Sequence, residues 1–443
     1  MTSRREFLKA GSVGLVGAGL PGWAKASGWA TPFLGSGGSA DTLTVAIMGV
    51  NSRGGALAQG FANAENCVIK TICDVDSRAA DRAAAEVEAA GFARPGTTDD
   101  VRRVLDDPDI DALVVAAPDH WHAPAALMAL DAGKHVYLEK PCSQNPREGE
   151  VLVAKQANSG LLIQMGNQQR SAPESIEIIS KIRDGLIGRP YFGRAWYANS
   201  RGSIGHGSPA PVPDWLNYEL WQGPAPRTAY RDNVVHYNWH WFKRWGTGEI
   251  CNNGTHEIDV CRWALDVQMP ERVQSTGGRY HFKDDWEFFD TQLASFEFAN
   301  NTQIVWDGRS CNGQPLYGRG RGSAIHGTEG TVIVDRDGYV AYDLGGRETE
   351  RRLRSDGIDA LDTRGGDRLT DFHIHNFLES VRGKDTLNAP IADARNSQLL
   401  CHVGNIAQFE HAVIEMNPED GRPRDQQHLT HWGRDYEPGW EIE

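Results

Sequence analysis

Apolar runs in the first part of the chain alternate with stretches of helical spacing. The apolar runs lie at 43–49, 67–74, 112–118, 135–138 and 161–168. A helix is expected at 50–64, after a glycine-containing turn, and another at 123–132. Strands that alternate with helices in this way usually form a parallel sheet with helices on both faces. The pattern therefore predicts an α/β domain built on a doubly wound parallel sheet.

The pattern changes beyond residue 188, where strand candidates follow one another without regular helices between them. These candidates lie at 190–198, 271–282, 290–298, 302–308, 322–327 and 331–335. Helical spacing returns at about 370–382 and 393–413. A series of strands followed by helices is typical of α+β domains. We therefore expect a second, α+β domain after the parallel sheet.

The segment 213–245 has neither a strand period nor a helix period, and we expect a long ordered loop there. It contains five of the fourteen tryptophans of the chain, together with three tyrosines and two histidines. So many aromatic side chains disfavour disorder, and ordered loops of this length are usually functional. Aromatic faces with arginine, asparagine and histidine between them suit a sugar, whereas the same composition also marks protein interfaces. Both interpretations stay open, and they can coexist.

Composition and charge exclude several classes of protein. The chain of 443 residues has a net charge of −14 and no lysine- or arginine-rich block, which argues against nucleic acid as a partner. Seven cysteines occur without a C-x-x-C pair, so neither a disulfide framework nor a zinc signature is expected. Cys251 and Cys261 could pair, but we expect free, buried thiols. His236 and His240 have an i, i+4 spacing without an evident third ligand, so we expect no metal site.

The beginning of the chain has the order of parts found in an export signal. Residues 3–9 read SRREFLK, and an apolar, glycine-rich run and the small-residue sequence AKA follow. This order predicts a secretory signal, and the paired Arg4 and Arg5 indicate the twin-arginine type. The apolar run is too short and too rich in glycine to span a bilayer stably, although an uncleaved anchor is the alternative. We expect a periplasmic or secreted protein that the twin-arginine machinery exports folded, with no stable membrane span after signal removal.

The N-terminal part of the predicted parallel sheet has the signature of a dinucleotide site. The phosphate fingerprint G-x-G-x-x-G is present as Gly49-x-Asn51-x-x-Gly54, with asparagine in place of the middle glycine. Asparagine tolerates a positive φ better than most residues do, so the turn is expected to form. The helix that begins near Arg53 offers free N–H groups and a positive dipole to a phosphate. Asp74 lies twenty residues after Gly54, where an acid accepts the ribose hydroxyls.

The acid at this position favours NAD, because the charge of Asp74 repels a 2′-phosphate. Ser77 and Arg78 follow closely and could hold a 2′-phosphate, so NADP stays an alternative. Ligands of parallel sheets bind beyond the carboxyl ends of the strands. Candidates for further cofactor contacts at these ends are Pro118, His122, Glu139 and Lys140.

Two sequence blocks resemble a known enzyme family. The sequence YLEKP ends a predicted strand and closes the block PDHWHAPAALMALDAGKHVYLEKP at 118–141. With GTHEIDVCRWAL at 254–265, this block resembles the Gfo/Idh/MocA oxidoreductases, and the likeness runs from about residue 43 to about 415. The resemblance implies a Rossmann domain and a C-terminal domain with a large, mostly antiparallel open sheet that faces the nicotinamide. The expected parts are a signal at 1–26, a linker at 27–41, an NAD(P)-binding Rossmann domain at 42–168, and an α+β substrate-binding and oligomerisation domain at 169–443.

Oxidation of a hydroxyl needs a base for the hydroxyl proton and a positive group for the developing alkoxide. Lys140 is the candidate for the positive group, since burial at a strand end lowers its pKa and holds it rigid. The alternative is a surface lysine paired with Glu139. His256 is the candidate base, because the dipole of the helix that it opens keeps an imidazole neutral. The resemblance makes this the position of the family's catalytic histidine.

The family pattern has an aspartate four residues before this histidine, where this chain has Asn252. Either Asn252 only binds substrate, or another group such as Glu249 or Asp259 orients His256. Asp259 and Arg262 are expected to form an intrahelical pair at i, i+3. The expected substrate contacts are Gln168, Arg170, Tyr237, Trp239, Asn252 and His256.

The resemblance implies an oxidoreductase that acts on a CH–OH group of a sugar or sugar derivative. An exported enzyme finds no maintained cofactor pool outside the cytosol, so we expect tightly bound NAD that is recycled in place. The first alternative is redox-neutral glycoside cleavage by oxidation, elimination and re-reduction. A second alternative is a non-catalytic cofactor-binding protein. The intact Glu-Lys-Pro sequence favours the oxidoreductase, and a homo-oligomer is expected by analogy.

Overall fold

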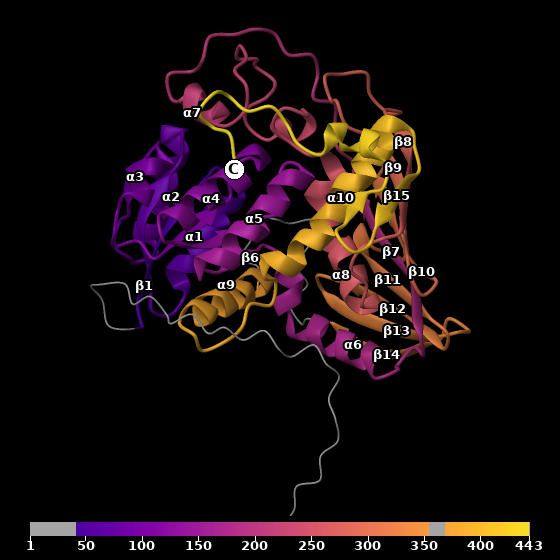
Figure 1. The fold of residues 1–443 in the computed structure, drawn as a ribbon. Coiled ribbons are helices and arrows are strands. Elements are labelled where there is room, and N and C mark those ends of the chain that lie inside the picture. Colours follow the sequence, from indigo (N-terminus) through magenta and orange to yellow (C-terminus); the bar gives the residue numbers. More distant parts are fainter. Residues whose placement is uncertain (1–40, 354–367, 443) are drawn as a thin grey trace, which may run out of the picture. The chain divides into compact units, whose positions relative to one another are not determined.

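The computed structural model describes residues 41–353 and 368–442, which form two large sheets with helices packed against them (Figure 1). The predicted signal at 1–26 and all but the last residue of the predicted linker at 27–41 lie outside the described residues. Within the described residues, no helix is both long enough and apolar enough to cross a membrane.

The first sheet is parallel and has six strands in the order β3-β2-β1-β4-β5-β6. The strands are β1 Leu43–Met48, β2 Cys67–Cys73, β3 Gly96–Thr98, β4 Ala112–Val115, β5 His135–Leu138 and β6 Ile163–Met165. The helices between them are α1 Arg53–Asn63, α2 Ser77–Ala89, α3 Val101–Leu105, α4 Asp119–Asp131 and α5 Pro146–Ser159. The doubly wound fold predicted from the sequence is confirmed. The strand order reverses between β1 and β4, and such sheets bind ligands beside this reversal.

Two details of the first sheet differ from the sequence prediction. The pattern does not predict β3, because its three residues are mostly exposed and include no apolar side chain. Helix α4 begins at Asp119, four residues before the predicted start. The extended backbone of Pro118 precedes this helix, and Asp119 supplies an acid to its first turn.

The second sheet has ten strands in the order β14-β13-β12-β11-β7-β10-β9-β8-β15-β16. All neighbours are antiparallel except β7 and β10. The strands are β7 Pro190–Ala198, β8 Arg272–Gly278, β9 Thr291–Phe298, β10 Thr302–Arg309, β11 Arg321–Gly327, β12 Gly330–Asp335, β13 Gly338–Asp343, β14 Glu348–Leu353, β15 Ile414–Asn417 and β16 Arg422–Pro423. The α+β class and the large, mostly antiparallel sheet are confirmed, although the pattern does not predict β13 to β16.

Three further helices pack against the two sheets. α8 Thr255–Leu265 and α10 Ile391–Glu410 pack on one face of the second sheet, and α9 Arg368–Val381 packs against α1 (Figure 1). α9 and α10 confirm the two helices predicted near the end of the chain. Shorter helices are η1 Gln168–Ser171, α6 Pro173–Arg183, α7 Tyr218–Gln222, η2 Asn238–Trp241, η3 Ile250–Gly254 and η4 Gln426–His431.

A long connection at 199–247, here called the roof segment, leaves β7 and crosses to the first sheet (Figure 1). It has a small apolar core that consists of Leu216, Tyr218, Trp221, Ala225, Tyr230, Val234, Phe242 and Trp245. This core confirms the prediction of an ordered loop. Three backbone hydrogen bonds join the roof segment to the first sheet: Ser77 N to Trp215 O (3.0 Å), Asn217 N to Val75 O (2.9 Å) and His120 N to Trp245 O (3.1 Å).

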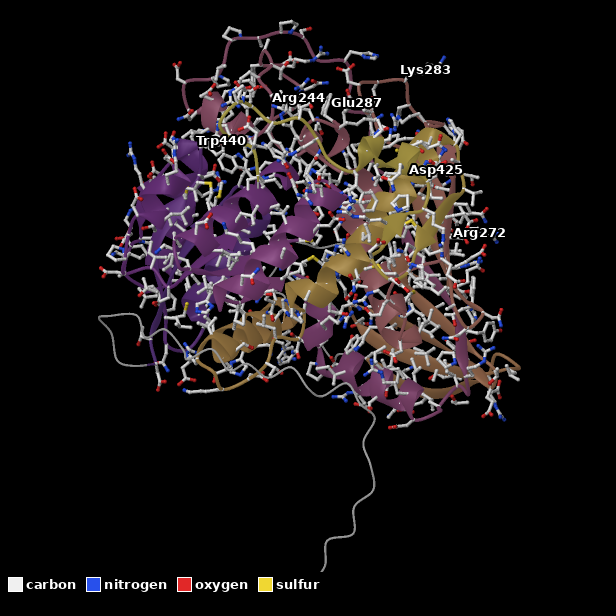
Figure 2. All side chains as sticks on the ribbon, in the orientation of Figure 1. Arg244, Arg272, Lys283, Glu287, Asp425 and Trp440 are labelled. Atoms are coloured by element: carbon white, nitrogen blue, oxygen red, sulfur yellow. The ribbon has the colours of Figure 1, made fainter. Side chains whose placement is uncertain are left out.

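The C-terminal residues hold the roof segment from its other side. One of these residues is Trp440, which is labelled in Figure 2. Its ring meets that of Trp121 in α4 edge to face, with centroids 5.1 Å apart. Glu437 N donates to Pro224 O at 3.0 Å. The end of the chain therefore contacts both α4 and the roof segment.

Candidate active site

A cavity of about 330 Å³ lies at the carboxyl ends of the first sheet, and three parts of the chain line it. The first sheet contributes one wall, the roof segment a second, and the second sheet with η3 and α8 a third. Of the predicted cofactor contacts, all except Gly54 line this cavity. Of the predicted substrate contacts, all except Arg170 line it. The structure thus brings together residues that are far apart in the sequence.

The turn after β1 packs so closely on its surroundings that it requires glycine at two positions. Gly49 has a φ of +82°, and a Cβ there would come within 2.6 Å of the backbone of Ala117. A Cβ on Gly54 would come within 1.8 Å of the carbonyl oxygen of Gly49. No other residue fits either position. The side chain of Ser52 does not cap α1, so the first N–H groups of this helix are available to an anion.

Asp74, at the end of β2, is oriented by two backbone donors. Val50 N donates to Oδ2 at 2.6 Å and Asp76 N donates to Oδ1 at 2.9 Å. Burial raises the pKa of Asp74, and these two hydrogen bonds oppose the rise. Arg78, which the sequence offers as a ligand for a 2′-phosphate, instead binds Asp76 through Nε and Nη2 and stacks over Trp215. The glycine cradle, the free helix N-terminus and the oriented carboxylate therefore fit NAD.

Glu139 is the centre of a network at the end of β5. Its Oε1 accepts from Arg53 Nε at 2.8 Å and from Gln168 Nε2 at 3.0 Å. Burial alone would raise the pKa of Glu139, but the charges of Arg53 and Lys140 hold it below its usual range. A Cβ on Gly166 would come within 2.9 Å of this carboxylate. The network fixes Arg53 and Gln168 at the edge of the cavity.

His122 joins the turns after β4 and β5. Its two ring nitrogens face the carbonyl oxygens of Pro141, at 2.5 Å, and Ala117, at 2.7 Å. Pro118 follows Ala117 and lines the cavity. These contacts hold the turn that contains Lys140 against the cofactor side of the cavity.

Lys140 reaches across the cavity to η3. Its Nζ donates to both the backbone oxygen of Asn252, at 2.7 Å, and the side-chain Oδ1, at 2.9 Å. Burial lowers the pKa of Lys140 to about 8. Glu139, which the sequence offers as an ion-pair partner, binds Arg53 instead. Asn252 is therefore the direct partner of Lys140.

His256 lies within a continuous helix and not at its start. η3 precedes α8 as a π-helix without a break. The expected effect of a helix N-terminus on His256 is therefore wrong, because the influence of the dipole falls off within the first turn. Burial and the charges of Arg336 and Lys140 hold the pKa of His256 well below its usual range. The imidazole is neutral, as expected, but for a different physical reason.

Neither carboxylate that the sequence offers for orienting His256 contacts its ring. Glu249 accepts from Arg201 Nε at 2.8 Å and from Ser310 Oγ at 3.0 Å. Asp259 binds Arg170 in a bidentate pair, with distances of 2.7 and 2.8 Å. Both of these alternatives are therefore wrong.

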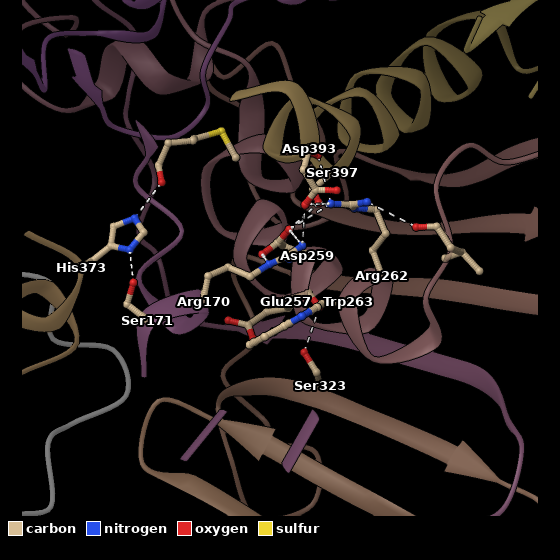
Figure 3. Close-up of polar contacts among 12 residues, drawn as sticks. Arg170, Ser171, Glu257, Asp259, Arg262, Trp263, Ser323, His373, Asp393 and Ser397 are labelled. Carbon is tan, nitrogen blue, oxygen red and sulfur yellow. Dashed lines mark hydrogen bonds and ion pairs between the residues drawn. The ribbon is translucent and has the colours of Figure 1, made fainter. Parts of the chain in front are cut away.

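Arg170 is buried below the active site. Figure 3 shows it with Asp259, Arg262 and Asp393 in one cluster of charges. Arg262 lies 3.9 Å from Asp259, as predicted for an i, i+3 pair, but its closer partner is Asp393, at 2.6 Å. The prediction that Arg170 contacts substrate does not fit this position. The cluster instead fixes α8 between η1 and α10, because removing one member would leave a buried charge unpaired.

The roof segment gives the cavity an aromatic wall. Trp239 and His240 stack with ring centroids 3.6 Å apart, and His240 Nδ1 faces Tyr237 O at 2.5 Å. The hydroxyl of Tyr237 accepts from Arg201 Nη1 at 2.5 Å. Aromatic faces beside fixed polar groups suit the C–H faces and hydroxyls of a sugar.

Several residues to which the sequence analysis assigns no role line the same cavity. Asp119, at the start of α4, accepts from Thr247 Oγ1 at 2.5 Å, and burial raises its pKa to about 7. Its position before a predicted helix was a usable signal. Tyr197, Arg201 and Arg321 lie on or beside strands of the second sheet, where no motif distinguishes them.

The thiols and histidines form no metal or disulfide site in the part of the chain that the structure describes. All seven cysteines are free, and Cys251 and Cys261 are both buried. No group of three metal-ligating side chains occurs among the described residues. His236 instead contacts Asp76 at 2.9 Å.

Two family models match the chain. One, described as oxidoreductase family, NAD-binding Rossmann fold, matches residues 43–167. The other, described as oxidoreductase family, C-terminal alpha/beta domain, matches residues 191–340. The chain belongs to the Gfo/Idh/MocA oxidoreductase family. The Rossmann domain of this Gfo/Idh/MocA oxidoreductase binds NAD.

Curated relatives of this Gfo/Idh/MocA oxidoreductase are named as glycosidases. A glycosyl hydrolase family 109 protein of Saccharopolyspora erythraea is 29% identical over 253 residues, which are 52% of this chain and 55% of the relative. An alpha-N-acetylgalactosaminidase of Shewanella oneidensis is 29% identical over 209 residues, 44% of this chain and 45% of the relative. The chain thus spans about half the length of these relatives.

Solved structures with the same fold are named as dehydrogenases or oxidoreductases. Levoglucosan dehydrogenase in complex with NADH and levoglucosan has a TM-score of 0.65 and 21% identity, covering 84% of this chain and 99% of that one. An oxidoreductase of Agrobacterium radiobacter in complex with NAD+, L-tartaric acid and magnesium has a TM-score of 0.61 and 14% identity, covering 84% and 98%. These likenesses show the shared fold.

Proposed function

We propose that this protein is an exported enzyme that oxidises and reduces a hydroxyl of a sugar or sugar derivative, with NAD kept in place between turnovers. One observation carries the proposal. Lys140 is bound to Asn252, and the neutral His256 lies in the same cavity, which the roof segment covers. The two groups supply the positive charge and the base that the oxidation of a hydroxyl needs.

The roles of the side chains follow from their contacts. NAD supplies the hydride acceptor and donor when it is bound in the cavity. A Lys140 ammonium that donates two N–H groups to Asn252 has a third N–H for a substrate oxygen. That N–H stabilises the alkoxide as the hydroxyl loses its proton. His256 takes the proton, and it returns the proton when a ketone is reduced.

The roof segment supports retention of the cofactor. Trp221, His236 and Tyr237 line the cavity together with Asp74. Hydrogen bonds at Trp215 and Trp245 fasten the roof segment to the first sheet. Exchange of a dinucleotide requires these contacts to open, so release is expected to be slow.

Export is proposed from the SRREFLK sequence at residues 3–9. The twin-arginine route carries folded proteins, and a folded protein can carry its cofactor with it. Outside the cytosol, the original redox state of the bound cofactor is restored without release of the cofactor. Lys140 and His256 then serve two half-reactions, the oxidation of one sugar and the reduction of a second substrate.

Redox-neutral glycoside cleavage is the second candidate, and the names of the curated relatives favour it. Oxidation of a ring hydroxyl to a ketone acidifies the neighbouring C–H. Loss of that proton expels the leaving group, water adds to the resulting double bond, and the ketone is reduced again without net electron transfer. Lys140 and His256 can serve each proton transfer. The intact Glu-Lys-Pro sequence keeps the oxidoreductase first, since glycosidases of this superfamily often depart from it.

The first experiment measures the cofactor content of the mature protein purified from the exported fraction. The protein is denatured, and the released nicotinamide cofactor is assayed. A near-stoichiometric yield supports recycling in place. An empty protein that binds NAD weakly contradicts it.

The loaded protein is then given pairs of sugars, and separately aryl glycosides, without added NAD. Turnover of a sugar pair supports the oxidoreductase, and release of the aryl group supports the glycosidase. Failure of both, with a fully loaded protein, would contradict both candidates and favour a cofactor-binding protein without catalysis.

A further inference from the structure

Helix α10 has a stripe of polar side chains on a buried face. Gln398, His402 and Asn405 have the spacing i, i+4 and i+7, which places them on one side of the helix. Each is between 1% and 6% exposed. Polar groups are costly to bury unless they are hydrogen-bonded, so the partners of this stripe are informative. These partners lie in η3, in the residues on either side of η3, and in the turn after Lys140.

His402 is the centre of the stripe and joins two segments of the active site. Its Nε2 lies 3.3 Å from Ser143 Oγ, and its Nδ1 lies 3.7 Å from Cys251 Sγ. Ser143 is three residues after Lys140, and Cys251 directly precedes Asn252. Burial lowers the pKa of His402 to about 3, so the ring is neutral and has one donor and one acceptor. The ring can therefore satisfy one hydrogen bond of each kind.

The other two members of the stripe hold the same π-helical segment. Gln398 Oε1 accepts from Thr255 Oγ1 at 2.9 Å. Asn405 Nδ2 donates to Thr247 O at 2.8 Å and lies 3.8 Å from Cys251 Sγ. A π-helical turn is rare and needs support from its surroundings. The stripe supplies this support on both sides of the segment, at Thr247 and Thr255, and at its second residue, Cys251.

The pair of Cys251 and His402 is not a second reactive site. Burial raises the pKa of Cys251 well above its usual range and lowers that of His402, so both side chains are neutral. A nucleophilic cysteine requires the thiolate. Neither residue is among those that line the cavity. The pair therefore acts as a structural hydrogen-bonded contact.

Two bridges connect the same two segments. One is at the cavity, where Lys140 Nζ donates to both oxygens of Asn252. The other lies behind it and runs from Ser143 through His402 to Cys251. We propose that the polar stripe of α10, with His402 at its centre, positions Asn252 so that both of its oxygens face Lys140. His402 is thus a positioning residue, and its importance for turnover rests on the proposed role of Lys140.

The test follows the titration of Lys140 directly, in the full mature protein with its bound NAD. Lysine labelled with 13C and 15N is incorporated, and the Nζ signal of Lys140 is assigned with Lys140→Arg. The variants are His402→Leu, which cannot hydrogen-bond, and His402→Gln, which restores one donor and one acceptor. His373→Leu is the matched control, because His373 is also buried and contacts Ser171 Oγ at 2.7 Å and Met165 O at 2.8 Å.

In His402→Leu we expect the pKa of Lys140 to fall by roughly one unit relative to the wild type, because the ammonium loses the oxygens of Asn252 that stabilise its charge. His402→Gln is expected to restore the original titration. His373→Leu should lower Tm while it leaves the titration of Lys140 unchanged. If His402→Leu does not fold, Asn405→Leu removes a neighbouring contact of the stripe and should give the same shift.

An unchanged titration in His402→Leu or Asn405→Leu, with a Tm loss equal to that of His373→Leu, would overturn the proposal. An equal shift in His373→Leu would overturn it too, because the effect would then not be specific to the stripe. The titration needs no substrate. A failure of the proposed sugar chemistry is therefore distinguishable from a failure of this inference.

Discussion

Lys140 and Lys134 show how position, and not residue type or contact, decides what a lysine can do. Both donate to backbone carbonyl oxygens: Lys140 to Asn252, and Lys134 to Asp107 and Ile110, at 2.7 and 2.9 Å. Burial lowers the pKa of both. Only Lys140 of the two lines the cavity. Lys134 is therefore a matched control for the active-site lysine.

Replacing Lys140 is predicted to reduce turnover far more than it reduces stability. Lys140→Met should lower kcat by about 10²- to 10⁴-fold, because the alkoxide loses its stabilising charge. Lys134→Met should lower Tm and leave kcat within about twofold, since it acts only on folding. Turnover and Tm are measured on both variants. Full turnover by Lys140→Met would exclude the role assigned to Lys140.

Asp119 is predicted to make stability depend on pH. Its pKa is about 7 in the folded protein and 3.8 for an exposed aspartate, so the folded state binds more protons between these two pH values. The stability that comes from protonated Asp119 is present below pH 3.8 and is lost as pH rises through about 7. Asp119→Asn should remove this dependence, a difference of at most roughly 4 kcal/mol at neutral pH.

The measurement is the free energy of unfolding from about pH 4 to about pH 8. The curves of the two proteins should separate as pH rises, with Asp119→Asn the more stable at the alkaline end. Parallel curves would show that Asp119 titrates near the same pH in the folded and unfolded states.

At the scale of elements, one carboxylate adds to the backbone hydrogen bonds that fasten the roof segment to the first sheet. Asp76 caps α2 and binds Arg78, and it also contacts His236 of the roof segment at 2.9 Å. Arg78 in turn stacks 3.5 Å from the ring centre of Trp215. Each contact contributes little free energy by itself, but together the contacts close the side of the cavity next to Asp74. We propose that retention of the cofactor depends on this fastening.

Removal of this fastening is predicted to speed the loss of NAD. His236→Ala should increase the dissociation rate about tenfold, the loss expected for one hydrogen bond to a charged group. His206→Ala is the control, since His206 makes a similar contact to Asp285, at 2.7 Å, that does not involve the first sheet. Dissociation is followed after dilution of the loaded protein. Equal rates in the two variants would mean that the roof segment does not limit release.

The cofactor side of the site could be predicted from the sequence, because short turns determine it. Gly49, Gly54 and Asp74 belong to one strand-turn-helix-strand unit, and its spacing reflects its geometry. The contact between Lys140 and Asn252 could not be predicted. It joins residues that are 112 positions apart in the sequence, and it depends on a π-helix that no sequence pattern predicts.

The same limit explains the error for Arg170. It follows the last strand of the first sheet, as a substrate contact would, and its residue type suits an anion or a sugar equally well. Whether it faces the cavity or Asp259 depends on how α8 packs, and α8 lies some ninety residues later in the chain. The polar stripe of α10 could not be predicted either, because polar residues on one side of a helix usually indicate a solvent-exposed face.

At the scale of the whole molecule, the export signal and the NAD site are proposed to act together. Substitution of Arg4 and Arg5 by lysine is predicted to keep the protein in the cytosol, because the paired arginines define the signal. The retained protein should contain as much NAD as the exported wild type, since loading precedes export. Fractionation and a cofactor assay measure both quantities. A retained protein without NAD would contradict this prediction, because the protein would then have folded in the cytosol without binding the cofactor.

The first sheet is completed by helices from the other end of the chain. Ile374, Phe377 and Leu378 of α9 are part of the apolar core beneath β1, and Ile391 and Ala394 of α10 belong to the core on the other side of the sheet. A ribosome therefore has to release nearly the whole chain before this core can close. Assembly of the NAD site is then a post-translational event, and chains cut short before α9 would present an open apolar face to proteases.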